Sequence, residues 1–293
     1  MCSNAPPKRS RMRRGSDAST RAGPLDRSRW PPLPQPHADF LTAALSRLRE
    51  DERIAGVAAA GSFARREVDR HSDLDLVVAV EAGAFDAVMQ ERQAIARSLG
   101  PLLASFVGEH VGETRLLICL YGPPLLHVDL KFVALPDAAQ RVDENVVLFD
   151  RAGRLARVLG SSRPAYPAPG PQWIEDRFWT WVHYLAGKLA RGELFEVLQG
   201  LGLLRALVFG PLLLARRGAQ PNGVRRLETS APDFVDRLRA TVALHDAADC
   251  ARAVRASIEL YRELRAEAAS ELVRNAEAER AAVAFFEDIA DSL

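Results

Sequence analysis

The sequence predicts an α+β protein in which a small mixed β-sheet domain with helices is followed by an all-α helical bundle. Three observations support this. The chain has 293 residues, enough for two modest domains. Its first half contains short apolar runs bounded by turn residues, which is typical of buried strands. From Trp173 onward the sequence is rich in Ala, Leu, Glu and Arg with helical periodicity.

The elements of the first half follow from the spacing of its apolar residues. A helix is expected to begin near His37, because apolar residues recur there every three or four positions. A second helix is expected over 84–99. Strands are expected over 54–60, 74–80, 102–107, 115–121, 125–135 and 146–150.

A segment rich in Gly, Pro and Ser separates the two halves. It predicts a linker over 160–171, between a sheet domain at 37–159 and a helical domain at 172–293. About five helices are expected in the second half, with breaks at 218–223 and near Pro232, and the last helix is expected over about 270–286. Residues 1–36 contain seven prolines and many basic residues, and we expect them to form a disordered tail.

Charge and cysteine content narrow the class of protein. The formal net charge is +1, but the first 30 residues carry +6, so the remaining chain carries −5. An acidic body makes nucleic acid an unlikely partner and favours small-molecule substrates. The sequence contains no run of about 18 apolar residues, so it predicts no membrane-spanning helix. Cys2, Cys119 and Cys250 lie far apart, which indicates neither disulfides nor a zinc site, so we expect a cytoplasmic protein.

Two aspartates open the predicted strand at 74–80. Asp73 and Asp75 are two residues apart, so both carboxylates project from one face of the strand. Paired carboxylates suit a hard divalent cation such as Mg²⁺, whose charge removes their repulsion. Taken alone, the pair also fits a solvated strand start.

Gly61 and Ser62 close the preceding predicted strand, twelve residues before Asp73. A short helix is expected to begin there, so that backbone N–H groups and the hydroxyl point outward and can hold phosphate. An ordinary turn with Ser62 as the helix N-cap explains the same residues. Arg65 and Arg66 fit either a phosphate contact or the protein surface.

A third carboxylate lies on a strand with strict alternation. His127, Asp129 and Lys131 share one face, and the residues between them are apolar. If this strand lies beside the Asp73 strand, three carboxylates meet in one pocket, as two-metal phosphoryl chemistry requires. A salt bridge of Asp129 to Lys131 is the structural alternative.

Gly61-Ser62, Asp73-Leu74-Asp75 and Asp129 together resemble the signature of the nucleotidyltransferase superfamily related to DNA polymerase beta. The layout, with a small catalytic domain before a helical one, is similar to bacterial aminoglycoside and lincosamide nucleotidyltransferases. The resemblance implies that Asp73, Asp75 and Asp129 hold two Mg²⁺ ions and that Gly61 and Ser62 bind the phosphates of ATP. It also implies transfer of AMP to a hydroxyl of a small molecule, such as an antibiotic, with release of pyrophosphate.

Several roles stay open at this stage. Asp129, Glu109 or Glu113 could accept the proton of the attacking hydroxyl. Lys188 could contact the triphosphate or extend from a helix surface. Trp179 and Trp181 could stack on a ligand or pack between helices, and Glu193 and Glu196 could bind a cationic acceptor or lie on a solvated helix face. The alternative functions are nucleotidyl transfer to protein or RNA, and a non-catalytic nucleotide-binding regulator of the antitoxin type.

Overall fold

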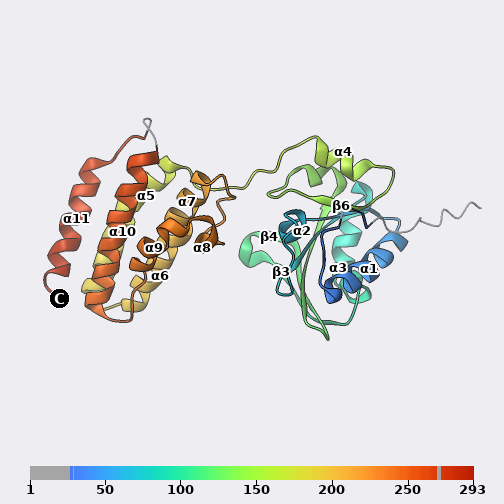
Figure 1. The fold of residues 1–293 in the computed structure, drawn as a ribbon, viewed down its shortest axis with the longest axis horizontal. Coiled ribbons are helices and arrows are strands. Elements are labelled where there is room, and N and C mark those ends of the chain that lie inside the picture. The colour runs from blue at the N-terminus through green and yellow to red at the C-terminus, as the bar shows by residue number, and fades with distance from the viewer. Residues whose placement is uncertain (1–26, 29, 269–271) are drawn as a thin grey trace, which may run out of the picture. The chain divides into compact units, whose positions relative to one another are not determined.

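The computed structural model describes residues 27, 28, 30–268 and 272–293. It divides into two compact units, Met1–Pro164 and Ala165–Leu293, and the division falls inside the predicted linker segment. Cys2, most of the basic residues of the N-terminal segment, and Ser270 lie outside the described residues. Each unit is described by itself below (Figure 1).

The first unit contains a six-stranded mixed sheet with the strand order β3-β4-β5-β2-β1-β6. Strands β2 and β5 pair in parallel, and the other neighbours pair antiparallel. The strands are β1 (Ile54–Ala59), β2 (Leu74–Val80), β3 (Leu102–Gly108), β4 (Glu113–Tyr121), β5 (Leu126–Ala134) and β6 (Val146–Asp150). All six lie close to the predicted ranges, because each is a short run of apolar residues bounded by turns.

One face of this sheet forms the main core of the unit. Helices α1 (Gln35–Glu50) and α3 (Phe85–Ser98) pack on it. Alternate residues of the strands, including Leu76, Val128 and Cys119, are buried in this layer. Both helices were predicted, and their apolar stripes account for their positions.

The opposite face is covered only in part. Helix α4 (Arg154–Gly160) and the 3₁₀-helix η3 (Leu135–Ala139) bury a smaller cluster, which includes Ala58, Ala79 and Val133. Helix α4 was not predicted. The Asp150 carboxylate accepts hydrogen bonds from the backbone N–H groups of the first turn of α4, at 3.0 and 2.9 Å, and so caps a helix only seven residues long.

The end of the predicted tail is part of the folded unit. Trp30 packs edge-on against Phe63 with ring centroids 6.3 Å apart, and Leu33 also contacts the main core. Helix α1 begins at Gln35, inside the range assigned to the tail. The expectation of disorder over the whole of 1–36 is therefore wrong for residues 30–36, because one Trp and one Leu in a Pro-rich segment suffice to anchor it on the sheet.

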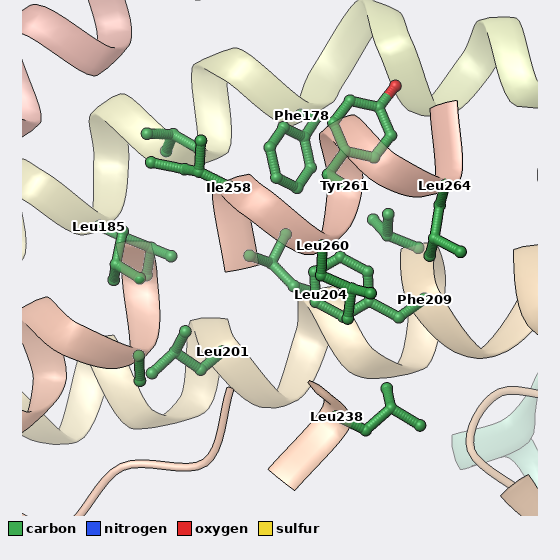
Figure 2. Packing of buried hydrophobic residues seen from close by; sticks show 14 of the residues in the cluster. Phe178, Leu185, Leu201, Leu204, Phe209, Leu238, Ile258, Leu260, Tyr261 and Leu264 are labelled. Carbon is green, nitrogen blue, oxygen red and sulfur yellow. The ribbon is translucent and has the colours of Figure 1, made fainter. Parts of the chain in front are cut away.

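The second unit is helical, as predicted. Its α-helices are α5 (Pro171–Ala190), α6 (Leu194–Leu204), α7 (Gly210–Arg216), α8 (Leu227–Ser230), α9 (Val235–Ala240), α10 (Ala247–Ala268) and α11 (Ala276–Ala290). A π-helical turn, η4 (Arg205–Phe209), joins α6 to α7, and a 3₁₀-helix, η5 (Pro232–Phe234), precedes α9. Figure 2 shows its apolar core, in which the Phe178 and Tyr261 rings stack with centroids 3.9 Å apart.

The last helix begins later than predicted. Asn275 caps α11, because its side chain accepts a hydrogen bond from the backbone N–H of Ala278 at 3.2 Å. The division into helices is also finer than the expected five, since short α8 and α9 form separate turns around Pro232.

One helical stretch of the described chain, Leu194–Arg216, is long and apolar enough to cross a membrane by length and composition. Half of its most apolar window is buried inside the helical unit. The same test is passed by core helices of water-soluble proteins, and the side chains of Leu201, Leu204 and Phe209 lie in the core shown in Figure 2.

Candidate functional site

Two of the predicted carboxylates lie side by side on the sheet. The parallel pairing of β2 and β5 places Asp75 directly in register with Asp129. Register partners project from the same face, and neighbouring strands are about 4.8 Å apart. Asp73 precedes β2 by one residue, and alternation puts it on the face of Asp75. The strand that carries Asp129 therefore lies beside the strand that follows Asp73, which is the arrangement that brings the three carboxylates to one face.

Gly61 lies against the carboxylate of Asp75. Its φ of +57° belongs to the left-handed region, which favours glycine. A Cβ atom built on Gly61 would overlap Oδ2 of Asp75 and lie 3.1 Å from its Cγ. The backbone N–H of neighbouring Ala60 also donates to the Asp75 carbonyl at 2.9 Å. Only glycine at this position allows the β1–α2 turn to approach the carboxylate this closely.

Ser62 carries a buried hydroxyl that has no hydrogen-bond partner among the described residues. It lies in the predicted short helix, α2 (Gly61–Ala64), and its side chain is almost fully buried. Its Oγ makes no hydrogen bond. Buried hydroxyls are nearly always paired, because an unmade hydrogen bond costs about 1–3 kcal/mol. An unpaired hydroxyl beside Gly61 fits a group that donates a hydrogen bond to an oxygen atom of a bound ligand.

The electrostatics of the site favour a cation. Burial raises the pKa of Asp129, the neighbouring His127 lowers it, and the negative charge of Asp73 raises it further. His127 Nε2 donates to Oδ1 of Asp129 at 2.9 Å. The repulsion from Asp73 shows that the two carboxylates sense each other, and a bound cation relieves such repulsion.

The fit to Mg²⁺ rests on these donors. In the described part of the chain, no three His, Cys, Asp or Glu side chains are already gathered as a metal site. Asp73, Asp75 and Asp129 nevertheless share one open face, and carboxylate oxygens are the ligands that Mg²⁺ prefers.

The two alternative proton acceptors differ in their surroundings. Glu113 forms ion pairs with Arg115 at 2.7 Å and Lys131 at 2.8 Å. The hydrogen bond from Arg115 has the largest effect, and the pKa of Glu113 falls to about 2. Glu113 is therefore a poor base. Glu109 lies in η2 (Glu109–Val111), beyond the end of β3.

A histidine that the sequence analysis did not select supports the loop before Asp73. His37, on α1, is almost fully buried, and its Nε2 donates to the carbonyl of Ser72 at 2.8 Å. The same loop is closed by Asp69, which accepts hydrogen bonds from the backbone of His71 and from the Ser72 hydroxyl. His71, in contrast, is exposed and receives a bond from Arg70. The signal for His37 was a single polar residue within an apolar helical stripe.

An open pocket of about 640 Å³ lies beyond the β1–α2 turn. Arg66 and Arg141 line it, together with residues of β6 and α4. Arg66 has a φ of +62°, which is uncommon outside glycine. Arg65 instead pairs with Glu67 at 3.2 Å. Of the two predicted arginines, Arg66 is therefore the one that faces a pocket.

The remaining predicted residues, Lys188, Glu193, Glu196, Trp179 and Trp181, lie in the helical unit. Lys188 forms an ion pair with Glu193 at 2.5 Å, which raises its pKa. Glu196 accepts a hydrogen bond from the Tyr184 hydroxyl at 2.8 Å. Trp179 is a core residue whose indole N–H donates to buried Glu175, so the stacking role considered for it is wrong.

Trp181 is partly buried and packs edge-on against Trp173. With Tyr184, Leu185 and neighbouring residues of α6, it lines a pocket of about 290 Å³. The pocket is nearly all apolar. None of the residues that line this pocket is charged.

Comparison with known proteins gives a similarity in fold alone. No protein-family model matches the sequence, and no curated protein is significantly similar to it. The solved structures that resemble it include an aminoglycoside 6-adenyltransferase from Bacillus subtilis, 13% identical, covering 84% of this chain and 96% of that one with a TM-score of 0.39. A nucleotidyltransferase-like protein from Exiguobacterium sibiricum 255-15 is 15% identical, covers 74% and 72% of the two chains, and has a TM-score of 0.35.

Proposed function

We propose that this protein is a nucleotidyltransferase that moves a nucleoside monophosphate, AMP from ATP, to a hydroxyl group of a small molecule with Mg²⁺. The observation that carries the proposal is the contact of Gly61 with the Asp75 carboxylate, next to the register partner Asp129. A phosphate cradle directly beside paired carboxylates is the arrangement that binding a metal-nucleotide complex requires. The cytosol, where ATP and Mg²⁺ are abundant, is the expected location.

Each residue has a definite role in this proposal. Asp73, Asp75 and Asp129 would hold Mg²⁺, which when bound neutralises charge on the phosphates. The Ser62 hydroxyl would donate to a phosphate oxygen, and the absent side chain of Gly61 leaves room for the Asp75 carboxylate beside this turn. Arg66 lines the pocket beyond this turn and would neutralise charge on the outer phosphates.

The reaction itself needs one proton acceptor. The acceptor oxygen forms a bond to the α-phosphorus, and the bond from this phosphorus to the bridging oxygen breaks, so pyrophosphate leaves. Asp129 takes the hydroxyl proton in this proposal, since burial favours its protonated form and Glu113 is held by two cations. The role of Lys188 in contacting the triphosphate remains a further part of the proposal.

Pyrophosphate release tests the proposal. The purified full chain is incubated with Mg²⁺ and each nucleoside triphosphate, with aminoglycosides, lincosamides and uncharged sugar alcohols as acceptors. Release that depends on one acceptor and is absent in Asp75→Asn supports nucleotidyl transfer. Asp86→Asn, an exposed change on α3, is the matched control and should behave as wild type. An undiminished rate in Asp75→Asn would overturn the proposal.

The outcome also separates the alternative functions. Mg²⁺-dependent binding of a nucleotide without release of pyrophosphate for any small acceptor would favour a protein or RNA acceptor, or a non-catalytic regulator. Radiolabelled AMP found on the protein itself or on added RNA would identify a protein or RNA acceptor. If the protein binds no nucleotide, the proposed nucleotidyl transfer and both alternative functions are wrong.

A further inference from the structure

The face that carries the carboxylates continues into an exposed apolar surface. The register places Ile118 opposite Asp129, and Phe106 opposite Ile118. Asp75, Asp129, Ile118 and Phe106 therefore form one row across β2, β5, β4 and β3. Leu120 lies beside this row, opposite His127.

These apolar side chains are unusually open. Phe106 is 52% exposed and Leu120 is 38% exposed, although both lie within strands. The Phe106 ring contacts His110, with ring centroids 5.7 Å apart. The phenyl ring thus lies at the end of the row as a flat apolar surface, about 10 Å from Asp129 at two strand spacings.

The in-line geometry of the proposed displacement indicates which reactant lies on this surface. The Gly61–Ser62 cradle follows β1, on the side of β2 away from β5. In an in-line displacement the leaving pyrophosphate and the attacking hydroxyl lie on opposite sides of the phosphorus. With the outer phosphates on the β1 side, the attacking molecule must approach from the β5 side, where Ile118 and Phe106 lie.

The charged residues on this face of the sheet indicate which class of acceptor it binds. A polycationic acceptor is bound by several carboxylates. Besides the three aspartates, β4 offers Glu113, but Arg115 and Lys131 both pair with it. Glu109 at the end of β3 supplies a single further charge. The face is apolar and balanced in charge instead of strongly acidic.

We infer that the acceptor is an uncharged hydroxyl compound with a flat apolar part, which packs on Phe106, Ile118 and Leu120 while its hydroxyl reaches Asp129. This inference rests on the proposed function and names its substrate class. It excludes polycationic aminoglycosides as the preferred acceptors. The apolar packing in this inference depends on side chains of β3 and β4, and only the hydroxyl contact involves Asp129 on β5.

The probe is 4-nitrophenyl β-galactoside, an uncharged sugar with an aromatic ring, and kanamycin is the polycationic comparison. Phe106→Ala and Leu120→Ala should each raise the KM for the galactoside about tenfold, as expected for losing one buried apolar side chain. The KM for ATP should not change. Leu125→Ala, an exposed leucine at the β4–β5 turn, is the matched control and should leave both values unchanged.

A binding measurement makes the test independent of turnover. Ligand-observed NMR with Asp75→Asn should detect the galactoside on the full chain, and the signal should be lost in the double variant with Phe106→Ala. Efficient transfer to kanamycin that neither Phe106→Ala nor Leu120→Ala affects would overturn the inference and leave the proposed function intact. Galactoside binding that depends on Phe106, without transfer to any acceptor, would instead leave the apolar surface intact and overturn the proposed function.

A third result would identify a different occupant. If the galactoside does not bind and Phe106→Ala lowers the unfolding temperature of the full chain by several degrees, the surface is covered by protein. That result overturns the inference.

Discussion

Gly61 and Asp75 are in such close contact that no side chain can be placed on Gly61 without moving the Asp75 carboxylate. Gly61 begins α2 directly after β1, Asp75 lies in β2, and a backbone hydrogen bond from the Ala60 N–H to the Asp75 carbonyl joins the turn to β2 at this point. The turn and the carboxylate are therefore one structural unit. Changes to the glycine act directly on the candidate metal ligand.

Gly61→Ala should abolish transfer, with a loss of at least about 100-fold, because displacement of a reacting group by 1 Å has effects of that size. The positive φ adds strain of about 1 kcal/mol. Gly112→Ala is the matched control, since Gly112 has a φ of +75° but no atom within 4 Å of a Cβ there. Its activity should be kept. Equal losses in the two variants would show that strain alone is responsible.

Asp129→Asn should leave the metal-free protein at least as stable as wild type, because it removes a buried charge that Asp73 repels. In wild type, Mg²⁺ with a non-hydrolysable ATP analogue should raise the unfolding temperature by mass action. The variant should lose most of this shift. Thermal unfolding with and without Mg²⁺ measures both effects, and an unchanged shift would remove Asp129 from the metal site.

Ser62→Ala should weaken nucleotide binding about tenfold, since a hydrogen bond to a charged group contributes about 1.5–3 kcal/mol. The unfolding free energy should not fall, because the Ser62 hydroxyl has no protein partner to lose. Ser257→Ala is the control, as the buried Ser257 hydroxyl donates to the Ala253 carbonyl at 2.8 Å. It should lose stability and keep nucleotide affinity. Calorimetry and urea unfolding distinguish the two patterns.

His37→Leu should lower kcat about tenfold, because the loop before Asp73 loses its hydrogen bond to the Ser72 carbonyl and a small displacement of a metal ligand is costly. Leucine keeps the apolar packing of α1. His71→Ala, on the exposed side of the same loop, should have little effect. Equal kcat values for His37→Leu and wild type would show that the bond does not position Asp73.

Glu175→Gln should destabilise the helical unit by about 2 kcal/mol, because the buried Arg265 guanidinium loses one of its two charged partners and keeps Glu279. Glu287→Gln, which breaks a partly exposed pair with Arg255, should cost less than about 1 kcal/mol. Urea unfolding followed by circular dichroism compares the two variants. Similar losses would mean that burial of the Glu175 pair has no special effect.

The same carboxylate predicts acid sensitivity. Burial raises the pKa of Glu175, but hydrogen bonds from Tyr261 and Trp179 outweigh this and hold it below its usual 4.5. A lowered folded pKa means that stability is present above the unfolded pKa and is lost as the pH falls through the folded value. Wild type should therefore lose stability below about pH 4.5, and Glu175→Gln should show a flatter profile over that range.

The sequence alone was sufficient for the fold class and for most elements of the sheet unit. Strands such as β1 and β5 were predicted because their residues show the required apolar runs or strict alternation. Helix α4 and residues 30–36 were not predicted. Their order depends on contacts from distant parts of the chain, such as Asp150 capping α4 and Trp30 packing on Phe63.

The candidate site shows the same division. Spacing along the chain, together with the resemblance to nucleotidyltransferases, was enough to name Gly61, Ser62, Asp73, Asp75 and Asp129 as candidates, because alternation and turn chemistry are local properties. Only the tertiary structure decided that Asp129 stands beside Asp75, that Glu113 is held by two cations, and that Phe106 ends the row. Strand order and register are set by the packing of the whole sheet, so residues far apart in sequence meet only after folding.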